Sequence, residues 1–201
     1  MSAVYVKEYA APPLDRGEIM RYLRTASVDA TLERELTAAL HEAQPVLSYR
    51  LCYAEFALRM GQGEIDLGFA RTASRDLAKN LAGCTHVVVF AATLGLHLDR
   101  LIARYSSLSP VRALCLQAIG AERIEALCDC FVTDLRYASF GGRVHARFSP
   151  GYGDLPLAFQ REIFHTLDPS RRIGLTLNES LLMSPSKSVT AFLGVKSYEV
   201  Y

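Results

Sequence analysis

One stretch of this sequence constrains the fold more than any other, THVVVFAATLG at residues 85–95. It lies inside a run from Asn80 to Leu98 that contains no aspartate, glutamate, lysine or arginine. Glycine, threonine and histidine residues interrupt this run, so it does not predict a membrane span. A short β-branched stretch without charges is typical of a strand that is buried on both faces. We therefore expect a central strand that leaves through a small-residue turn into a helix.

The composition is that of a single globular domain over residues 1–201. A chain of 201 residues with 50% hydrophobic and 21% charged residues can bury a core without disulfides or a structural metal. Its 22 basic and 21 acidic residues nearly cancel, which disfavours nucleic acid and anionic membranes as partners. The amino terminus lacks the basic start and apolar stretch of a secretory signal, so we expect a cytoplasmic protein.

The cysteines and histidines do not form a recognisable metal or catalytic motif. Five cysteines at irregular spacings argue against a disulfide framework. Cys128 and Cys130 lie two apart on a predicted helix, and we expect them to pack in the core rather than to bind metal. The histidines show no HxH, HxxxH or HExxH spacing, and the sequence has no nucleophile motif or Walker loop. Hydrolases and nucleotide-driven enzymes are therefore disfavoured.

Periodicity, capping residues and turn signals predict elements of both kinds. We expect strands at residues 4–9, 48–60, 85–95, 143–148, 174–183 and 188–195, with residues 61–70 returning as a hairpin partner of 48–60. We expect helices from Asp15 to about Arg24, from Ser27 or Asp29 to about Ala43, and at residues 74–82, 96–105, 110–137 and 157–167. Their sum predicts an α+β domain with a mainly antiparallel sheet.

The most distinctive short motif is RFSPGYGDLP, at residues 147–156. Pro150 fixes its own φ and favours an extended conformation at Ser149. Gly151 allows a backbone or a ligand to approach closely, because it has no side chain. These residues predict a turn whose shape is set before anything binds.

The same motif carries polar groups that suit a ligand. Arg147 offers a planar fork of donors for a carboxylate, and Tyr152 adds an aromatic face and a hydroxyl. The alternative is a tight connection in which Arg147 pairs with Asp154. The residue pattern leaves both interpretations open.

A second feature lies on the long helix predicted before this motif. Glu122, Glu125 and Asp129 follow one another at intervals of three and four residues and therefore share one helix face. The favoured interpretation is a solvated face. The alternative is a face that receives a cationic group of a ligand.

RFSPGYGDLP and the later segment IGLTLNESLLMSPSKSVTAFLG together resemble the activation (reactivation) domain of cobalamin-dependent methionine synthase. That family carries an Arg-x-x-Pro-Gly-Tyr signature, then a helix, then Gly-x-x-Leu-x-Glu-Ser-x-x-Met-x-Pro-x-x-Ser-Val. The second pattern is supplied here by Gly174, Leu177, Glu179, Ser180, Met183, Pro185, Ser188 and Val189. The resemblance covers roughly the last third of the chain and implies a C-shaped α+β domain with a twisted antiparallel sheet.

The resemblance also implies a function and a set of ligand contacts. The family domain binds S-adenosylmethionine and presents its methyl group to cobalamin in the inactive cob(II)alamin state, which flavodoxin typically reduces. By resemblance, Arg147 meets the polar end of the ligand. The turn formed by Ser149, Pro150, Gly151 and Tyr152 lines the site.

Three further contacts follow from the resemblance. The family uses an acidic residue on the preceding helix, for which Glu125 is our choice and Glu122 the alternative. Tyr198 is the best positional match for a tyrosine after the last strand. An acidic contact near the amino terminus has no clear counterpart, and Asp15 is the candidate.

The sequence departs from the family in ways that bear on its partners. It has no tryptophan, and Ser184 stands where the family often has one. The chain is barely longer than the activation domain, so we expect an accessory subunit for a separate methionine synthase, which holds the cobalamin, with a flavodoxin-like reductant. The alternatives are a docking module for another corrinoid protein and a self-sufficient small-molecule methyltransferase. The latter lacks a supporting glycine-rich loop.

Overall fold

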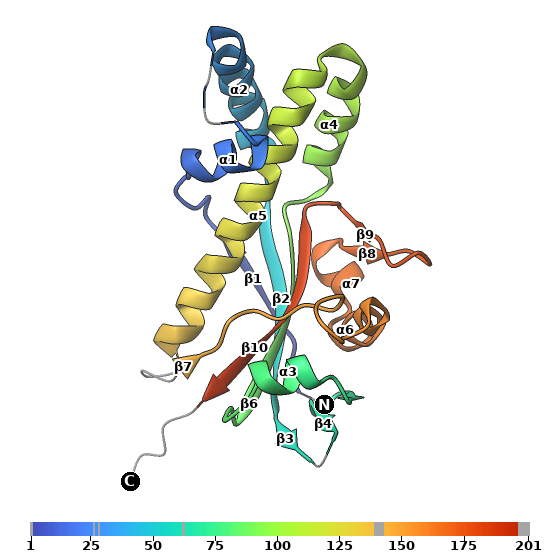
Figure 1. Ribbon diagram of the computed structural model, residues 1–201. Coiled ribbons are helices and arrows are strands. Elements are labelled where there is room, and N and C mark those ends of the chain that lie inside the picture. The colour runs from blue at the N-terminus through green and yellow to red at the C-terminus, as the bar shows by residue number, and fades with distance from the viewer. Residues whose placement is uncertain (1, 26, 28, 62, 139–142, 197–201) are drawn as a thin grey trace.

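A five-stranded antiparallel sheet forms the centre of the molecule. The computed structural model describes residues 2–25, 27, 29–61, 63–138 and 143–196. In spatial order the strands are β1 (Tyr5–Tyr9), β2 (Tyr49–Ala57), β6 (His86–Thr93), β10 (Ser188–Lys196) and β7 (Arg143–Val144). Figure 1 shows that the long strands are strongly twisted. The expected α+β class with a mainly antiparallel sheet is confirmed.

Strand β6 is buried on both faces, as its sequence predicts. Successive side chains of a strand point to opposite faces of the sheet. Phe90 and Phe192, from β6 and β10, are fully buried in different cores. Along β6, Val88, Phe90 and Ala92 belong to one core, and Val87, Val89 and Ala91 belong to the other.

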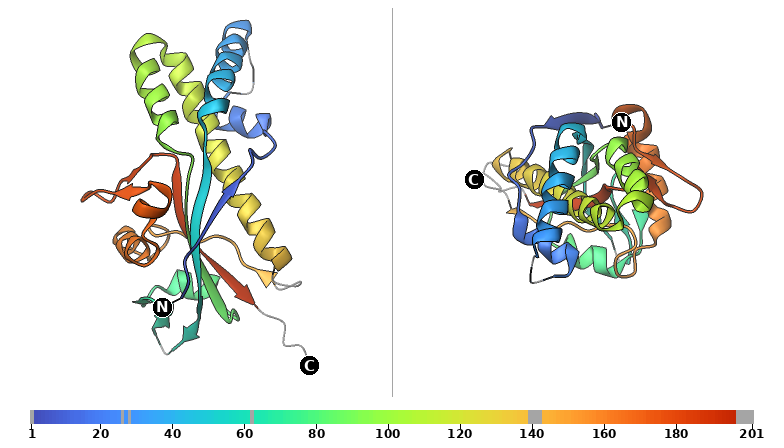
Figure 2. Two further views of the ribbon diagram at one scale, coloured as in Figure 1. Left: turned by 180° about the vertical axis from the view of Figure 1, so that it is seen from behind. Right: turned by 90° about the horizontal axis from the view of Figure 1, so that it is seen from above.

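Helices cover each face of the sheet. The first core lies under α1 (Arg16–Leu23), α2 (Ala30–Ala43), α4 (Leu96–Leu108) and α5 (Pro110–Ala138). The second lies under α3 (Arg75–Asn80), α6 (Gln160–Leu167) and α7 (Pro169–Ile173), with the small sheet β3 (Arg59–Met60), β4 (Ile65–Asp66) and β5 (Arg71–Thr72). Figure 2 shows α2, α4 and the first half of α5 extending beyond one end of the sheet. Two short 3₁₀ helices lie at Gln44–Val46 and Leu157–Phe159.

The predicted helix starts follow from side-chain caps. Asp15 accepts a hydrogen bond of 3.1 Å from the backbone N–H of Glu18 at the start of α1. Asp29, rather than Ser27, caps α2 through a 2.7 Å bond from the N–H of Leu32. Such caps satisfy backbone donors that the first helical turn leaves free.

Three expected strands differ in the structure. Residues 174–183 form no continuous strand, because Leu181 adopts a left-handed φ of 63° and the chain folds into a hairpin of β8 (Thr176–Leu177) and β9 (Met183–Ser184). Residues 61–70 pair with β3 through β4, whereas β2 pairs with β1 and β6. The strand expected at 143–148 is limited to β7 and one bridge between Phe148 and Phe192.

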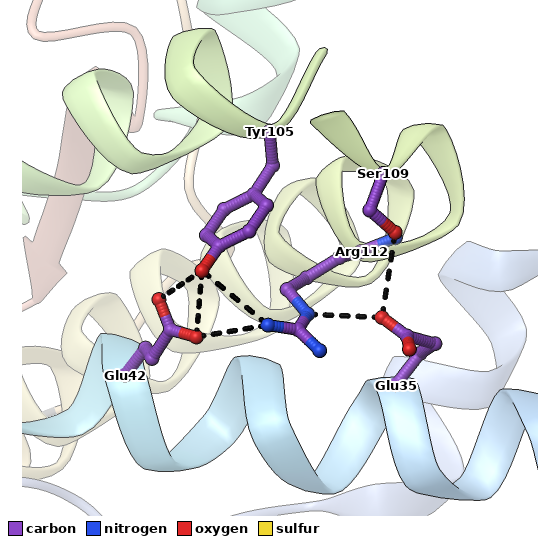
Figure 3. Close-up of polar contacts among 5 residues, drawn as sticks. All are labelled: Glu35, Glu42, Tyr105, Ser109 and Arg112. Carbon is purple, nitrogen blue, oxygen red and sulfur yellow. Dashed lines mark hydrogen bonds and ion pairs between the residues drawn. The ribbon is translucent and has the colours of Figure 1, made fainter. Parts of the chain in front are cut away.

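A polar cluster ties α2 to α4 and α5 (Figure 3). Arg112 donates to Glu35 Oε2 at 2.9 Å and to Glu42 Oε1 at 3.1 Å. The hydroxyl of Tyr105 donates to the same Glu42 carboxylate at 2.7 Å. One guanidinium thus pairs with two carboxylates that lie about two turns apart on α2, which holds this helix against the α4–α5 turn.

Candidate functional site

The main pocket lies beside the second half of α5 and has a volume of about 630 Å³. Helix α5 and the segment that follows β7 form much of its wall, and the first residue of α6 and the starts of β9 and β10 complete it. In Figure 1 the segment between β7 and α6 crosses in front of the sheet. Four of the predicted site residues in the turn segment line the pocket: Arg147, Ser149, Pro150 and Tyr152.

Arg147 lies between two carboxylates of α5. Its Nη2 is 2.7 Å from Glu125 Oε2 and 3.2 Å from Asp129 Oδ1. The side chain of Arg147 is 24% exposed, against 43% for Glu125 and 72% for Asp129. The site therefore presents one guanidinium and two partly hydrated carboxylates at the pocket wall.

Arg147 does not pair with Asp154, so the alternative of a simple connection closed by that ion pair is wrong. Asp154 instead accepts hydrogen bonds at the start of α3, from the backbone N–H of Arg75 at 2.7 Å, from that of Asp76 at 3.2 Å and from the Ser74 hydroxyl. The Ser74 hydroxyl and these amides lower the pKa of Asp154. The turn is thereby attached to α3.

The turn itself is closed by its own backbone, as the sequence predicts. The N–H of Gly151 donates to the Leu155 carbonyl at 2.9 Å, and the N–H of Tyr152 donates to the Ser149 carbonyl at 3.2 Å. Gly151 has a φ of +91°, a region that strongly favours glycine. Leu155 anchors the turn in the second core, while Tyr152 is 68% exposed.

Glu122 does not lie in the main pocket, and the interpretation of a solvated carboxylate face is wrong for this residue. It is only 3% exposed, forms an ion pair with Arg123 and accepts a 3.0 Å hydrogen bond from the backbone N–H of Asp15. Arg123 also donates to the carbonyls of Pro12 and Pro13 at 2.6 and 2.7 Å. Glu122 therefore fastens the amino-terminal segment to α5, and Glu125 is the helix carboxylate beside Arg147.

A second depression of about 580 Å³ adjoins the first and shares Glu125 and Asp129 with it. Asp15 lies in its wall, with its side chain engaged as the cap of α1. Asp15 therefore lines the neighbouring depression and not the main pocket, and Glu125 and Asp129 lie between the two. Tyr198 falls outside the residues that the structure describes.

Two buried polar residues of the pocket were missed in the sequence. Gln160 and Thr190 line the main pocket and are 5% and 2% exposed. Gln160 begins α6 and lies outside both motifs, and Thr190 lies in β10 directly after Val189, the last residue of the second pattern. Their position depends on how the strands pair, which no local pattern reveals.

Cys128 packs in the first core, as expected, and its burial raises the pKa of its thiol to about 12. Cys130 is half-buried. Within the described part of the chain, no three His, Cys, Asp or Glu side chains gather in a way that could hold a metal ion. In that same part, every helix is too short or too polar to cross a membrane.

Comparisons with known proteins identify the fold. No protein-family model and no curated protein sequence matches the chain. A solved structure, the MetH reactivation domain bound to AdoHcy, matches this structure with a TM-score of 0.73 and 16% sequence identity. The match covers the whole of this chain and 80% of that chain. The protein therefore has the fold of the MetH reactivation domain, which confirms the fold that the two sequence motifs imply.

Proposed function

We propose that this protein binds S-adenosylmethionine in the main pocket and serves as an accessory subunit for reactivating a cobalamin-dependent methionine synthase. The shared fold supports this proposal, since the MetH reactivation domain was solved with AdoHcy, which is S-adenosylmethionine without its methyl group. A fold alone does not define a ligand. The observation that carries the proposal is the charge pattern around Arg147.

The charges of the site complement those of the ligand. S-adenosylmethionine carries one carboxylate and two cationic groups, an ammonium and a sulfonium. The site carries one guanidinium, Arg147, and two carboxylates, Glu125 and Asp129. Arg147 pairs with both carboxylates, which leaves a net charge of −1 at this wall, so binding would exchange these ion pairs for pairs with the ligand.

The shape of the site also suits a ligand of this size. A volume of about 630 Å³ lies within the usual range for small-molecule pockets. The turn at 147–156 is closed by its own hydrogen bonds and attached to α3 through Asp154. Because this wall is ordered before binding, little conformational entropy is lost when the ligand arrives.

The acceptor of the methyl group lies outside this chain. We propose cobalamin held by a methionine synthase, with one electron supplied by a flavodoxin-like protein. The methyl transfer breaks the bond between sulfur and the methyl carbon, and the bonding electrons stay on sulfur as the neutral thioether of S-adenosylhomocysteine. The contribution of this chain is to bind and orient the sulfonium nucleoside.

Calorimetric titration with S-adenosylmethionine and S-adenosylhomocysteine tests the binding step. Arg147→Ala should weaken both ligands by at least about tenfold, because a charge-assisted hydrogen bond to the shared carboxylate is lost. Glu125→Gln should weaken S-adenosylmethionine more than S-adenosylhomocysteine, since only the former has the sulfonium. Arg171→Ala is the matched control, because the Arg171 side chain is 89% exposed and lies outside the pocket.

Failure of S-adenosylmethionine to bind the parent protein would overturn the proposal and favour a docking module for another corrinoid protein. A second assay mixes the protein with a methionine synthase cobalamin module, a flavodoxin-type reductant and S-adenosylmethionine. Methylcobalamin absorbance should appear only in the complete mixture. Persistent cob(II)alamin would contradict the reactivation role, and methyl transfer to small molecules without the partner would favour a self-sufficient methyltransferase.

A further inference from the structure

Gln160 and Thr190 are exceptional among the buried polar residues of this protein. Six polar or charged side chains are buried in the described part of the chain: Ser74, Thr93, Glu122, Arg123, Gln160 and Thr190. The first four have hydrogen-bond partners. Among the described residues, three buried side-chain oxygens have no hydrogen-bond partner: Gln160 Oε1, Thr190 Oγ1, and Asn80 Oδ1 of a half-buried residue. Of these three residues, Gln160 and Thr190 line the main pocket.

An unpaired buried oxygen is unfavourable, and native structures rarely keep one without a reason. The neighbouring strand residue shows that β10 can pair its hydroxyls. Ser188 Oγ contacts Thr93 Oγ1 at 2.8 Å and donates to the Pro185 carbonyl at 2.8 Å. Of the three unpaired oxygens, two therefore belong to side chains in the wall of the main pocket.

Both residues stand on fixed elements. Gln160 begins α6, whose Ile163 and Leu167 are fully buried in the second core. Thr190 lies in β10, opposite Ala91 of the central strand β6. Groups held in this way keep their position while a ligand binds, which is a requirement for selective recognition.

We infer that Gln160 and Thr190 recognise the adenine base of the ligand, an inference that rests on the proposed binding of S-adenosylmethionine. A carboxamide matches adenine because its oxygen accepts from the 6-amino group while its nitrogen donates to the adjacent ring nitrogen. The inference requires the Gln160 amide to turn about χ3, on its fixed helix, so that both atoms face the pocket. The Thr190 hydroxyl adds a donor and an acceptor beside them.

The base fits this part of the pocket better than the other groups of the ligand do. The amino-acid end is ionised, and its charges match Arg147, Glu125 and Asp129 on the α5 side. Neutral, buried partners suit the neutral base, because desolvating an ion there would be costly. Phe148, Met183 and Val189 line the same pocket and provide apolar contact for the faces of a planar ring.

The test compares S-adenosylhomocysteine with its 6-deamino analogue, in which hydrogen replaces the amino group of the base. The parent protein should bind S-adenosylhomocysteine roughly tenfold more tightly than the analogue. Gln160→Leu should reduce this preference to less than about twofold. Thr190→Val should weaken S-adenosylhomocysteine by a smaller factor, about two- to fivefold, because it removes a single hydrogen-bonding group.

Two control variants separate base recognition from general effects. Arg147→Ala should weaken both compounds and keep their ratio, since Arg147 meets the other end of the ligand. Gln117→Leu makes the same replacement at an exposed position of α5 and should leave both affinities unchanged. Thermal midpoints of Gln160→Leu and Thr190→Val should equal or exceed that of the parent, because each change removes an unpaired buried oxygen.

The outcomes distinguish this inference from the proposed function. If the parent binds neither S-adenosylmethionine nor S-adenosylhomocysteine, both proposals fail. If the parent binds them but Gln160→Leu keeps the tenfold preference, the inference alone is overturned. A crystal structure with S-adenosylhomocysteine in which the base contacts neither Gln160 nor Thr190 would also overturn the inference while leaving the proposed function intact.

Discussion

Asp154 connects the turn at residues 147–156 to helix α3. Its carboxylate accepts from the Ser74 hydroxyl and from the backbone N–H groups of Arg75 and Asp76. Gly153, beside it, has a φ of +53°, and a Cβ there would collide with Asp76. One short side chain and a glycine thus bring the turn into close contact with α3.

Asp154→Asn tests this connection through its pH dependence. The pKa of Asp154 is lowered from its ordinary value of 3.8, so its carboxylate stabilises the fold above about that pH. The stabilisation is lost as pH falls through the lower, folded-state pKa. The variant should therefore melt several degrees below the parent at pH 7, and the two thermal midpoints should approach each other as pH falls below about 3.8.

Thermal unfolding followed by circular dichroism at each pH provides the measurement. Asp168→Asn is a suitable control, because among the described residues the Asp168 side chain has a single ion pair, at 3.9 Å from Arg171. Its midpoint should follow that of the parent across the pH range. Curves for Asp154→Asn and the parent that stay parallel down to pH 3 would contradict the assignment of this carboxylate.

At the residue scale, the sequence predicted the components of the site that stand in local motifs. The rigid turn and Arg147 were read from RFSPGYGDLP, and Glu125 from its place on a helix face and a family resemblance. Glu122 shares the predicted helix face with Glu125, but its carboxylate pairs with Arg123 rather than with Arg147. Gln160 and Thr190 carried no local signal, because strand pairing and packing bring them to the pocket.

Helix α5 passes very close to the loop that precedes β10, and a glycine allows the approach. A Cβ added at Gly120 would lie 2.7 Å from Leu98 Cδ2 and 2.9 Å from Lys187 Cγ. Leu98 is fully buried, and desolvation lowers the pKa of the half-buried Lys187. The α4–α5 pair and the loop before β10 therefore meet at a position where a Cβ would force the Leu98 and Lys187 side chains to move.

Gly120→Ala should destabilise the protein by about 1–3 kcal/mol, although alanine is the better helix former by about 1 kcal/mol. Denaturant unfolding gives the free-energy difference. In a Lys187→Ala background, two of the three close contacts disappear, and the cost of Gly120→Ala should fall. Equal costs in both backgrounds would show that Lys187 does not contribute to the tight packing.

At the element scale, helices were easier to predict than strands. Asp15, Asp29 and Ser74 mark helix starts with local hydrogen bonds, so the sequence around them suffices. The segment 174–183 has the composition of a strand, yet it turns back at Leu181, whose positive φ is unusual for leucine. The β8–β9 hairpin was therefore missed.

At the scale of the whole molecule, the sheet order could not be predicted from local patterns. The strands β6 and β10 are neighbours in the sheet but are separated in the chain by α4, α5 and α6. Only the absence of charges in β6 indicated its central place. The sheet order was therefore not predicted, whereas the fold implied by the family resemblance is confirmed by the shared fold with the MetH reactivation domain.

The two cores share their central strands, which predicts that they unfold together. Phe90 and Phe192 are fully buried in the first and second core, respectively. Each change to alanine should cost about 3–5 kcal/mol, because it removes a large apolar side chain and leaves a cavity. Since β6 and β10 contribute to both cores, loss of either core should destabilise the other.

Denaturant unfolding of Phe192→Ala should therefore remain a single transition. Buried Tyr49 and Tyr105 belong to the first core and contribute to the near-ultraviolet circular dichroism, while the far-ultraviolet signal reports all elements. The two signals should change at the same denaturant concentration, although the substitution lies in the second core. Leu182→Ala, at a 64% exposed position, should cost less than about 0.5 kcal/mol. A near-ultraviolet transition that lags behind the far-ultraviolet one would mean that the first core, with its half of the pocket, is stable without the second.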